Sequence, residues 1–196
     1  MNWLSQLVEH WSHKDGIANA FGLILYTDAH PHIKKVLADN DYWNALDKIS
    51  SSRWVIFSIR AKPGHYSYPN HRLPPGAIGM MIGVWKEPDE NEYLLQEFEI
   101  KSTEKLPQLI VFAKGTNGEI LSQSIRLDDF SKEKAYDSLK NAIKIISKAI
   151  DDVLPENIKS AEGVYTAIDM SVSNYKQWQL IKKGVLYLKW IKDLFT

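Results

Sequence analysis

Residues 106–112 have the sequence LPQLIVF, a proline near the start of an apolar run that is one strand long. A continuous apolar run of this length is typical of a strand buried on both faces of a sheet. Thr116-Asn117-Gly118 follows it, and an Asn-Gly pair is a strong signal for a tight turn between antiparallel strands. We therefore expect residues 119–127 to pair with 106–112 as a β-hairpin.

Two more apolar runs of strand length precede this hairpin, at residues 22–27 and 53–59. Both have the continuous pattern expected of strands buried on both faces. Between them, apolar residues recur at helical spacing after Pro31, which suits a first helical turn because proline has no N–H to leave unpaired. Asp39-Asn40-Asp41 is expected to divide this helix in two. The segment thus predicts a β-α-β unit.

A second strong helical pattern begins after Ser131, a residue type that caps helices well. Its apolar stripe runs to Val153, and Pro155 is expected to end it. The carboxylate pairs Asp128-Asp129 and Asp151-Asp152 flank this helix. Neighbouring residues point apart on a helix or strand, so we assign these pairs helix-end and turn roles.

The element order is strand, helix, strand, then helix, proline-led strand, hairpin strand, helix, and it resembles the thioredoxin-like fold. The most specific local match is Phe98-Glu99-Ile100, then the 106–112 strand, then Asn117-Gly118-Glu119. The resemblance covers roughly residues 15–153 and implies a central mixed β-sheet flanked by helices, with a cis bond before Pro107. We expect an α/β domain over residues 1–154 and a helical C-terminal extension over 155–196.

In that family two cysteines flank a Gly-Pro pair at the start of the helix after the first strand. Here Asp28-Ala29-His30-Pro31-His32 falls in that place, and aligning the prolines puts Ala29 and His32 at the cysteine positions. The chain has no cysteine, so the family's redox chemistry does not carry over. What the resemblance still implies is a groove beside Pro107, suited to an extended peptide or an anion.

The expected function is therefore that of a non-redox binding or interaction module with no cofactor. The proline-rich segment 62–75 is long for a loop, and long loops are often functional. The candidate ligand-binding residues come from the helix start, the proline-led strand and this loop, and they are His30, Pro31, His32, Pro107, His65, Tyr66 and His71.

The main alternative is a metal-dependent enzyme. Asp28, His30 and His32 alternate at a strand-to-helix junction, and His65 and His71 are available to add ligands. Histidine with carboxylate suits zinc or iron(II), although no HExxH spacing supports such a site. A glutathione-transferase relative, suggested by residues 106–107 and 121–124, and a flavodoxin-like fold with its site at the strand carboxyl ends are further alternatives.

Composition limits the partners. Lys and Arg together number 24 and Asp and Glu also number 24, so the chain lacks the broad positive field that holds nucleic acid. No stretch approaches the roughly 20 apolar residues that span a bilayer. Residues 1–11 show no basic segment before an apolar run, so we expect no secretory signal and a cytoplasmic location.

Residues 175–195 form a helical pattern that is apolar over most of its circumference. One domain surface does not cover so wide an arc, and exposed apolar patches mark interfaces. We expect this helix to pair with a second copy as a two-fold homodimer, with packing against its own domain as the alternative. The candidate interface residues are Trp178, Ile181, Val185, Leu186, Leu188 and Trp190.

Overall fold

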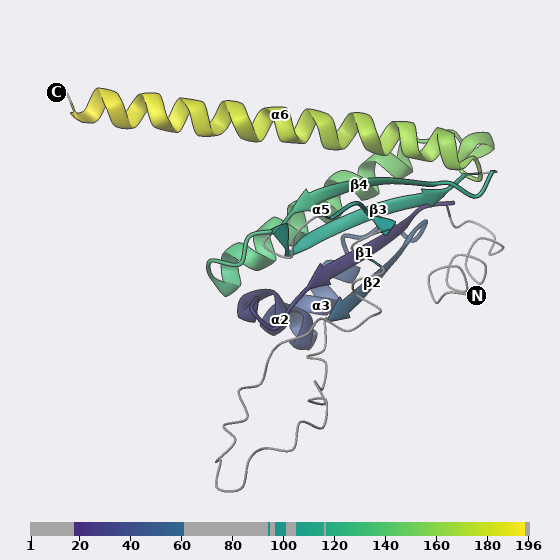
Figure 1. Cartoon of the computed structure of the whole chain (residues 1–196), viewed down its shortest axis with the longest axis horizontal. Helices are drawn as coiled ribbons and strands as arrows, with labels where there is room; N and C mark the ends of the chain where they lie inside the picture. Colours follow the sequence, from purple (N-terminus) through teal and green to yellow (C-terminus); the bar gives the residue numbers. More distant parts are fainter. Residues whose placement is uncertain (1–17, 61–93, 95–96, 101–104, 116, 195–196) are drawn as a thin grey trace, which may run out of the picture.

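The centre of the protein is a four-stranded mixed sheet with the strand order β2-β1-β3-β4 (Figure 1). It is seen in a computed structural model that describes residues 18–60, 94, 97–100, 105–115 and 117–194. The strands are β1 (Phe21–Tyr26), β2 (Val55–Arg60), β3 (Gln108–Lys114) and β4 (Ile120–Arg126). β1 pairs parallel with β2 and antiparallel with β3, and β3 pairs antiparallel with β4. The predicted mixed α/β class is confirmed.

The central strands are buried on both faces, as their apolar runs predicted. Every residue of β1 is buried, and so is every residue of β3 except the last. The same prediction for residues 53–59 is wrong, because β2 lies at the edge of the described sheet. Its residues Val55, Ile56 and Phe57 are half-buried, and Ser58 is exposed.

The predicted hairpin is present. Gly118 has a φ of 87°, a left-handed conformation that glycine adopts without steric cost. The Gly115 N–H donates to the Glu119 carbonyl oxygen at 2.9 Å, which closes the turn between β3 and β4. The Leu106–Pro107 peptide bond is cis, as the sequence analysis expected.

Four α-helices complete the described structure. They are α2 (Pro31–Ala38), α3 (Asn40–Asp47), α5 (Lys132–Asp151) and α6 (Ala161–Leu194), with a short 3-10 turn at Pro155–Asn157. Asp39 ends α2 and caps α3, so the predicted division of that helix is confirmed. Ser131 caps α5, where its side chain accepts a hydrogen bond from the Lys134 N–H.

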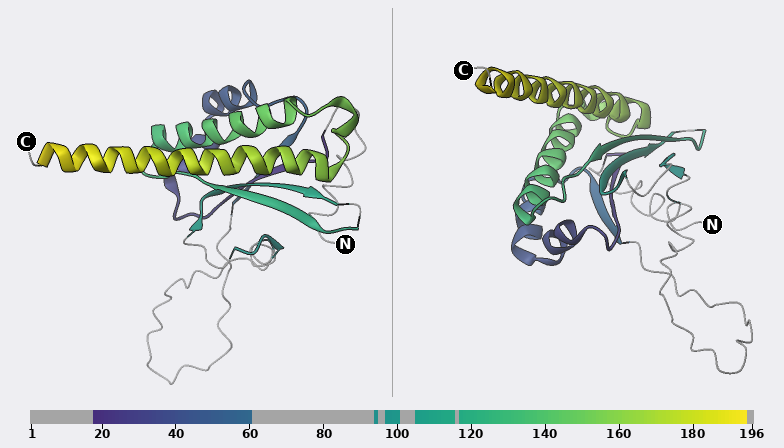
Figure 2. Two further views of the ribbon diagram at one scale, coloured as in Figure 1. Left: turned by 90° about the horizontal axis from the view of Figure 1, so that it is seen from above. Right: turned by 60° about the vertical axis from the view of Figure 1, so that its left-hand side comes forward.

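The two faces of the sheet bury separate apolar clusters. On one face, Ile24, Leu109 and Val111 pack with residues from all four helices (Figure 2). On the other face, Leu23, Ile110 and Phe112 pack with Leu94, Phe98, Ile100 and Leu106. This alternation along each strand follows from the period of two in side-chain direction.

The C-terminal helix begins earlier than its sequence pattern suggested, at Ala161 rather than near Tyr175. Val164, Ile168 and Val172 recur every fourth residue and are buried against the helical side of the sheet. Its C-terminal half extends beyond the sheet in both views (Figures 1 and 2). No helix within the described ranges is long and apolar enough to cross a membrane.

Candidate functional site

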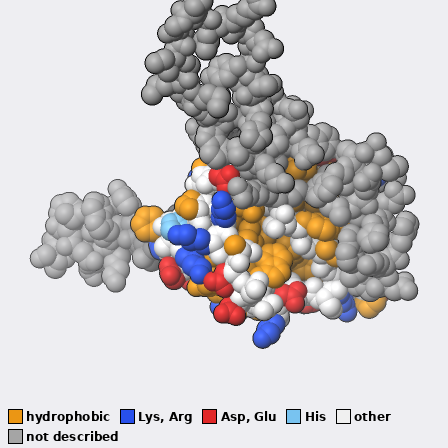
Figure 3. All heavy atoms as spheres, turned by 90° about the horizontal axis from the view of Figure 1, so that it is seen from below, with side chains coloured by type: hydrophobic (Ala, Val, Ile, Leu, Met, Phe, Trp, Pro, Cys, Tyr) orange, Lys and Arg blue, Asp and Glu red, His pale blue; other side chains and the backbone are white. Residues whose placement is uncertain are grey.

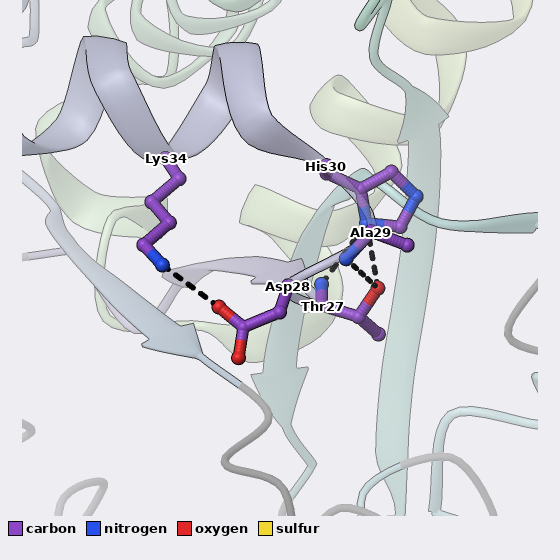
Figure 4. A network of polar contacts seen from close by, with 5 residues as sticks. All are labelled: Thr27, Asp28, Ala29, His30 and Lys34. Carbon is purple, nitrogen blue, oxygen red and sulfur yellow. Dashed lines mark hydrogen bonds and ion pairs between the residues drawn. The ribbon is translucent and has the colours of Figure 1, made fainter. Parts of the chain in front are cut away.

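The turn between β1 and α2 is closed by its own side chains (Figure 4). His30 is the N-cap of α2, and its ring nitrogen Nδ1 accepts a hydrogen bond from the Thr27 N–H at 3.0 Å. The Thr27 hydroxyl oxygen lies 2.9 Å from the same Nδ1 atom and also accepts from the Ala29 N–H at 3.3 Å. The Nδ1 atom is therefore occupied by the turn, and only Nε2 of His30 remains for a ligand.

Asp28 lies in this turn but points away from His30, toward the next turn of α2 (Figure 4). Its carboxylate pairs with the Lys34 ammonium at 2.9 Å, and the Asp28 side chain is only 13% exposed. Asp28 and His30 are thus engaged separately, on opposite sides of the turn. Within the described ranges, no group of three or more His, Asp and Glu side chains is placed to hold a metal ion.

The third predicted ligand, His32, lies near the start of α5. The pKa of Glu133 is lowered by its own backbone N–H, then by the Ser131 hydroxyl, with a smaller electrostatic contribution from His32. The Nδ1 atom of His32 is buried and makes no hydrogen bond in the described structure. Among the described residues, His32 does not form a metal-binding group with Asp28 and His30.

The first turn of α2 is capped by a residue distant in sequence. The carboxylate of Asp129, in the β4–α5 connection, accepts a hydrogen bond from the Ile33 N–H at 2.6 Å. A helix start attracts anions through such free N–H groups and through its dipole. The carboxylate of Asp129 fills this role from within the chain, which weakens the expectation that an external anion binds there.

The structure brings Pro107 next to the β1–α2 turn. Leu25 pairs with Gln108 across the β1–β3 ladder, so the carboxyl end of β1 lies beside the start of β3. Pro31 is exposed and the two histidines beside it are half-buried, but Pro107 is buried. Its carbonyl oxygen accepts from the Leu127 N–H at 2.9 Å and so extends the β3–β4 pairing. Pro107 is therefore buried at the place where the resemblance implies a groove.

A second buried polar atom near the β1–α2 turn, besides His32 Nδ1, lacks a partner in the described structure. Gln108 is only 7% exposed, and its amide nitrogen donates to the Lys105 carbonyl oxygen at 3.0 Å. Its side-chain oxygen Oε1 is buried and makes no hydrogen bond with any described residue. A buried acceptor without a hydrogen bond lowers the stability of the fold. A hydrogen-bond donor from a ligand that reached Oε1 would remove this cost.

Three of the predicted ligand-binding residues, His65, Tyr66 and His71, lie outside the described residues. The sequence did not predict the contact of Thr27 with the His30 ring or the hydrogen bond from the Ile33 N–H to Asp129. Asp128-Asp129 was assigned a turn or helix-end role, which is confirmed, but its target in α2 lies 96 residues away along the chain. No local pattern identifies a partner at that separation.

The exposed side of α6 carries the second predicted site. Trp178 is 55% exposed, Leu180 69% and Ile181 65%. These large apolar side chains lie near the middle of α6, and the C-terminal half of the helix extends beyond the sheet (Figure 1). The other predicted interface residues belong to the same helix, but their side chains lie outside the described structure, and they are Val185, Leu186, Leu188 and Trp190.

Comparison with known proteins gives no relative from which a function is transferred. No protein-family model, curated protein or solved structure matches the chain.

Proposed function

We infer that this protein is a non-redox, thioredoxin-like interaction module, and that it associates with a second copy of itself through the C-terminal half of α6. The observation that carries this proposal is the projecting helix with three large, exposed apolar side chains, Trp178, Leu180 and Ile181. Monomeric proteins rarely leave large apolar patches uncovered, and tryptophan is enriched in interface cores.

The thioredoxin-like part of the proposal is supported by the order of elements. A β-α-β unit, a β-hairpin and a terminal helix build one mixed sheet, with the helices packed on one of its faces. At the family's catalytic position, the His30 ring accepts a hydrogen bond from the Thr27 N–H, and the Asp129 carboxylate accepts one from the Ile33 N–H.

The charge pattern of α6 favours a particular pairing. Residues 176–194 contain five lysines and one aspartate, whereas residues 161–175 contain Glu162, Asp169 and no basic residue. Two basic halves placed side by side would repel each other. An antiparallel pair avoids this, because the basic half of one copy then lies along the outer face of its partner's residues 161–175.

The outer face of residues 161–175 is suited to contact the basic half of the partner's helix. Glu162 and Met170 are both exposed, and Met170 is 62% exposed. Methionine adapts its shape to irregular apolar surfaces, and lysine stems cover apolar area while their ammonium groups stay in water. The result is a two-fold interface in which each copy contributes both halves of the helix.

Light scattering coupled to size exclusion tests the association. The wild-type chain should be a dimer, and Leu180→Glu with Ile181→Glu should give a folded monomer. Phe130→Glu is the matched control, because Phe130 is 82% exposed but lies before α5, away from α6. A wild-type chain that remains monomeric at high protein concentration would contradict the proposal, as would equal dissociation by the control substitution.

The contacts of Asp28 and the two histidines do not favour the alternative of a metal-dependent enzyme. Asp28 is paired with Lys34, the Nδ1 atom of His30 is held by Thr27, and the Nδ1 atom of His32 is buried. No observation among the described residues favours a metal site at this turn.

A further inference from the structure

A cavity lies between α3, β1, β2 and α5. Its volume is about 180 Å³, and most of its lining is apolar. The principal apolar lining residues are Ile24, Trp43, Leu46, Trp54, Ile56 and Ile143. For comparison, a buried apolar cavity of roughly 150 Å³ accommodates benzene. The cavity is therefore large enough for one ring or a short branched chain.

One wall of the cavity is rigidly built. The indole N–H of Trp54 donates to the Ser147 hydroxyl oxygen at 3.1 Å, and the Ser51 N–H donates to the same oxygen at 3.1 Å. The ring of Trp54 lies directly on Gly22 of β1, where a Cβ atom would stand 2.8 Å from Cζ3 of the ring. Trp54 is 5% exposed, so these contacts hold one face of the cavity in place without a ligand.

The opening is polar and negative. Trp43 is 37% exposed, and the two polar lining residues are Asp47, the last residue of α3, and Ser50 just beyond it. The C-terminal end of a helix carries partial negative charge and favours cations, as does the carboxylate of Asp47. Indole faces also attract cations. None of the described residues that line the cavity is basic.

Figure 3 shows the molecule from below the view of Figure 1, where α2, α3 and β2 lie lowest. Apolar side chains gather in the middle of the described surface, and Lys, Arg, Asp and Glu side chains lie around their border.

We propose that this cavity binds a small organic ammonium ion, with its apolar body against Trp54 and Ile143 and its charged head beside Asp47 and Trp43. The ligand class follows from the volume, the two indoles, the carboxylate and the helix end, all of which lie in one place. This site is separate from α6, so it stands whether or not the chain forms a dimer.

The test is a titration followed by the indole N–H signals in a ¹H–¹⁵N correlation spectrum, with Trp43→Phe used to assign the signal of Trp43. The probes are phenethylamine, 2-phenylethanol and 3-phenylpropionate, which share a ring and two methylenes but carry positive, no and negative charge. Millimolar phenethylamine should shift the signals of Trp43 and Trp54, the alcohol should bind more weakly, and the carboxylate most weakly.

Two exposed positions on α3 make the charge test specific. Asp47→Asn should weaken phenethylamine binding by about two- to fivefold, the range of an exposed ion pair, and leave the alcohol unaffected. Asp41→Asn, at the other end of the same helix, is the matched control and should change neither. Equal or tighter binding of the carboxylate, absent shifts at Trp43 and Trp54, or an unchanged affinity in Asp47→Asn would overturn the proposal.

Discussion

Replacing Gly22 by alanine should lower the free energy of unfolding, although glycine is normally a poor residue for the middle of a strand. The added Cβ would lie 2.8 Å from Cζ3 of Trp54 and 3.2 Å and 3.3 Å from two side-chain carbons of Ile56. Trp54 does not move aside easily, because its indole N–H is held by the buried Ser147 hydroxyl. Something in this layer of the core must therefore shift.

The magnitude follows from two opposing effects. Overpacking a core costs about 1–3 kcal/mol, whereas removing a strand glycine returns about 0.5–1 kcal/mol of backbone entropy. We expect Gly22→Ala to be destabilised by about 1–2 kcal/mol, as measured by urea unfolding with an unchanged dependence on denaturant.

The double variant identifies the contact responsible. In a Trp54→Leu background, Gly22→Ala should cost little or nothing, because the smaller side chain leaves room for the methyl group. The difference between the two backgrounds is then the coupling energy of positions 22 and 54. A Gly22→Ala protein as stable as wild type, or an equal loss in both backgrounds, would refute the reasoning.

Three further predictions test individual contacts by unfolding measurements. Ser131→Ala should lose about 1 kcal/mol because the Lys134 N–H loses its cap, whereas Ser131→Asn should lose much less; equal losses would contradict the capping role. Asp39→Asn keeps the cap of α3 but loses the ion pair with Lys132. The hydrogen bond from Lys132 is the main reason that the pKa of Asp39 lies below its ordinary value of 3.8. Because the folded-state pKa is lowered, the ionised Asp39 carboxylate stabilises the fold at neutral pH. Wild type should therefore have a larger free energy of unfolding than Asp39→Asn at neutral pH, and this difference should vanish as the pH falls through the folded-state pKa. A difference that stays constant with pH would contradict this. Gln108→Met removes the buried Oε1 atom, which has no partner among the described residues, and should stabilise the protein by about 1 kcal/mol; a loss of stability would count against this reasoning.

Much of the sheet was predictable because its signals are local. Apolar runs of strand length identified β1 and β3, Asn117-Gly118 located the hairpin, and Asp39 marked the break between α2 and α3. Each of these features depends on residues within one element or one turn. The burial of β2 was overestimated because an apolar run does not reveal whether a strand lies at the centre or the edge of a sheet.

The candidate sites were less predictable because they depend on contacts between distant segments. His30 and His32 were correctly placed at the start of α2, but the sequence did not show that Asp129 caps this helix or that Asp28 pairs with Lys34. The start of α6 was also missed. The first half of α6 has a buried side formed by Val164, Ile168 and Val172, which pack in the core on one face of the sheet. Only the folded structure shows this contact.

The way this chain satisfies its own polar groups decides where a ligand has room to act. At the β1–α2 turn, internal partners already use the helix N–H groups and the ring nitrogen of His30. At α3 the internal hydrogen bonds do not fill the cavity, because the Trp54 N–H donates to Ser147 while the Trp54 side chain remains part of the cavity lining. An external ligand at the turn would have to displace existing hydrogen bonds, whereas one in the cavity would only displace solvent from apolar walls. The cavity is therefore better suited to a small molecule than the β1–α2 turn, which is the site that the resemblance implies.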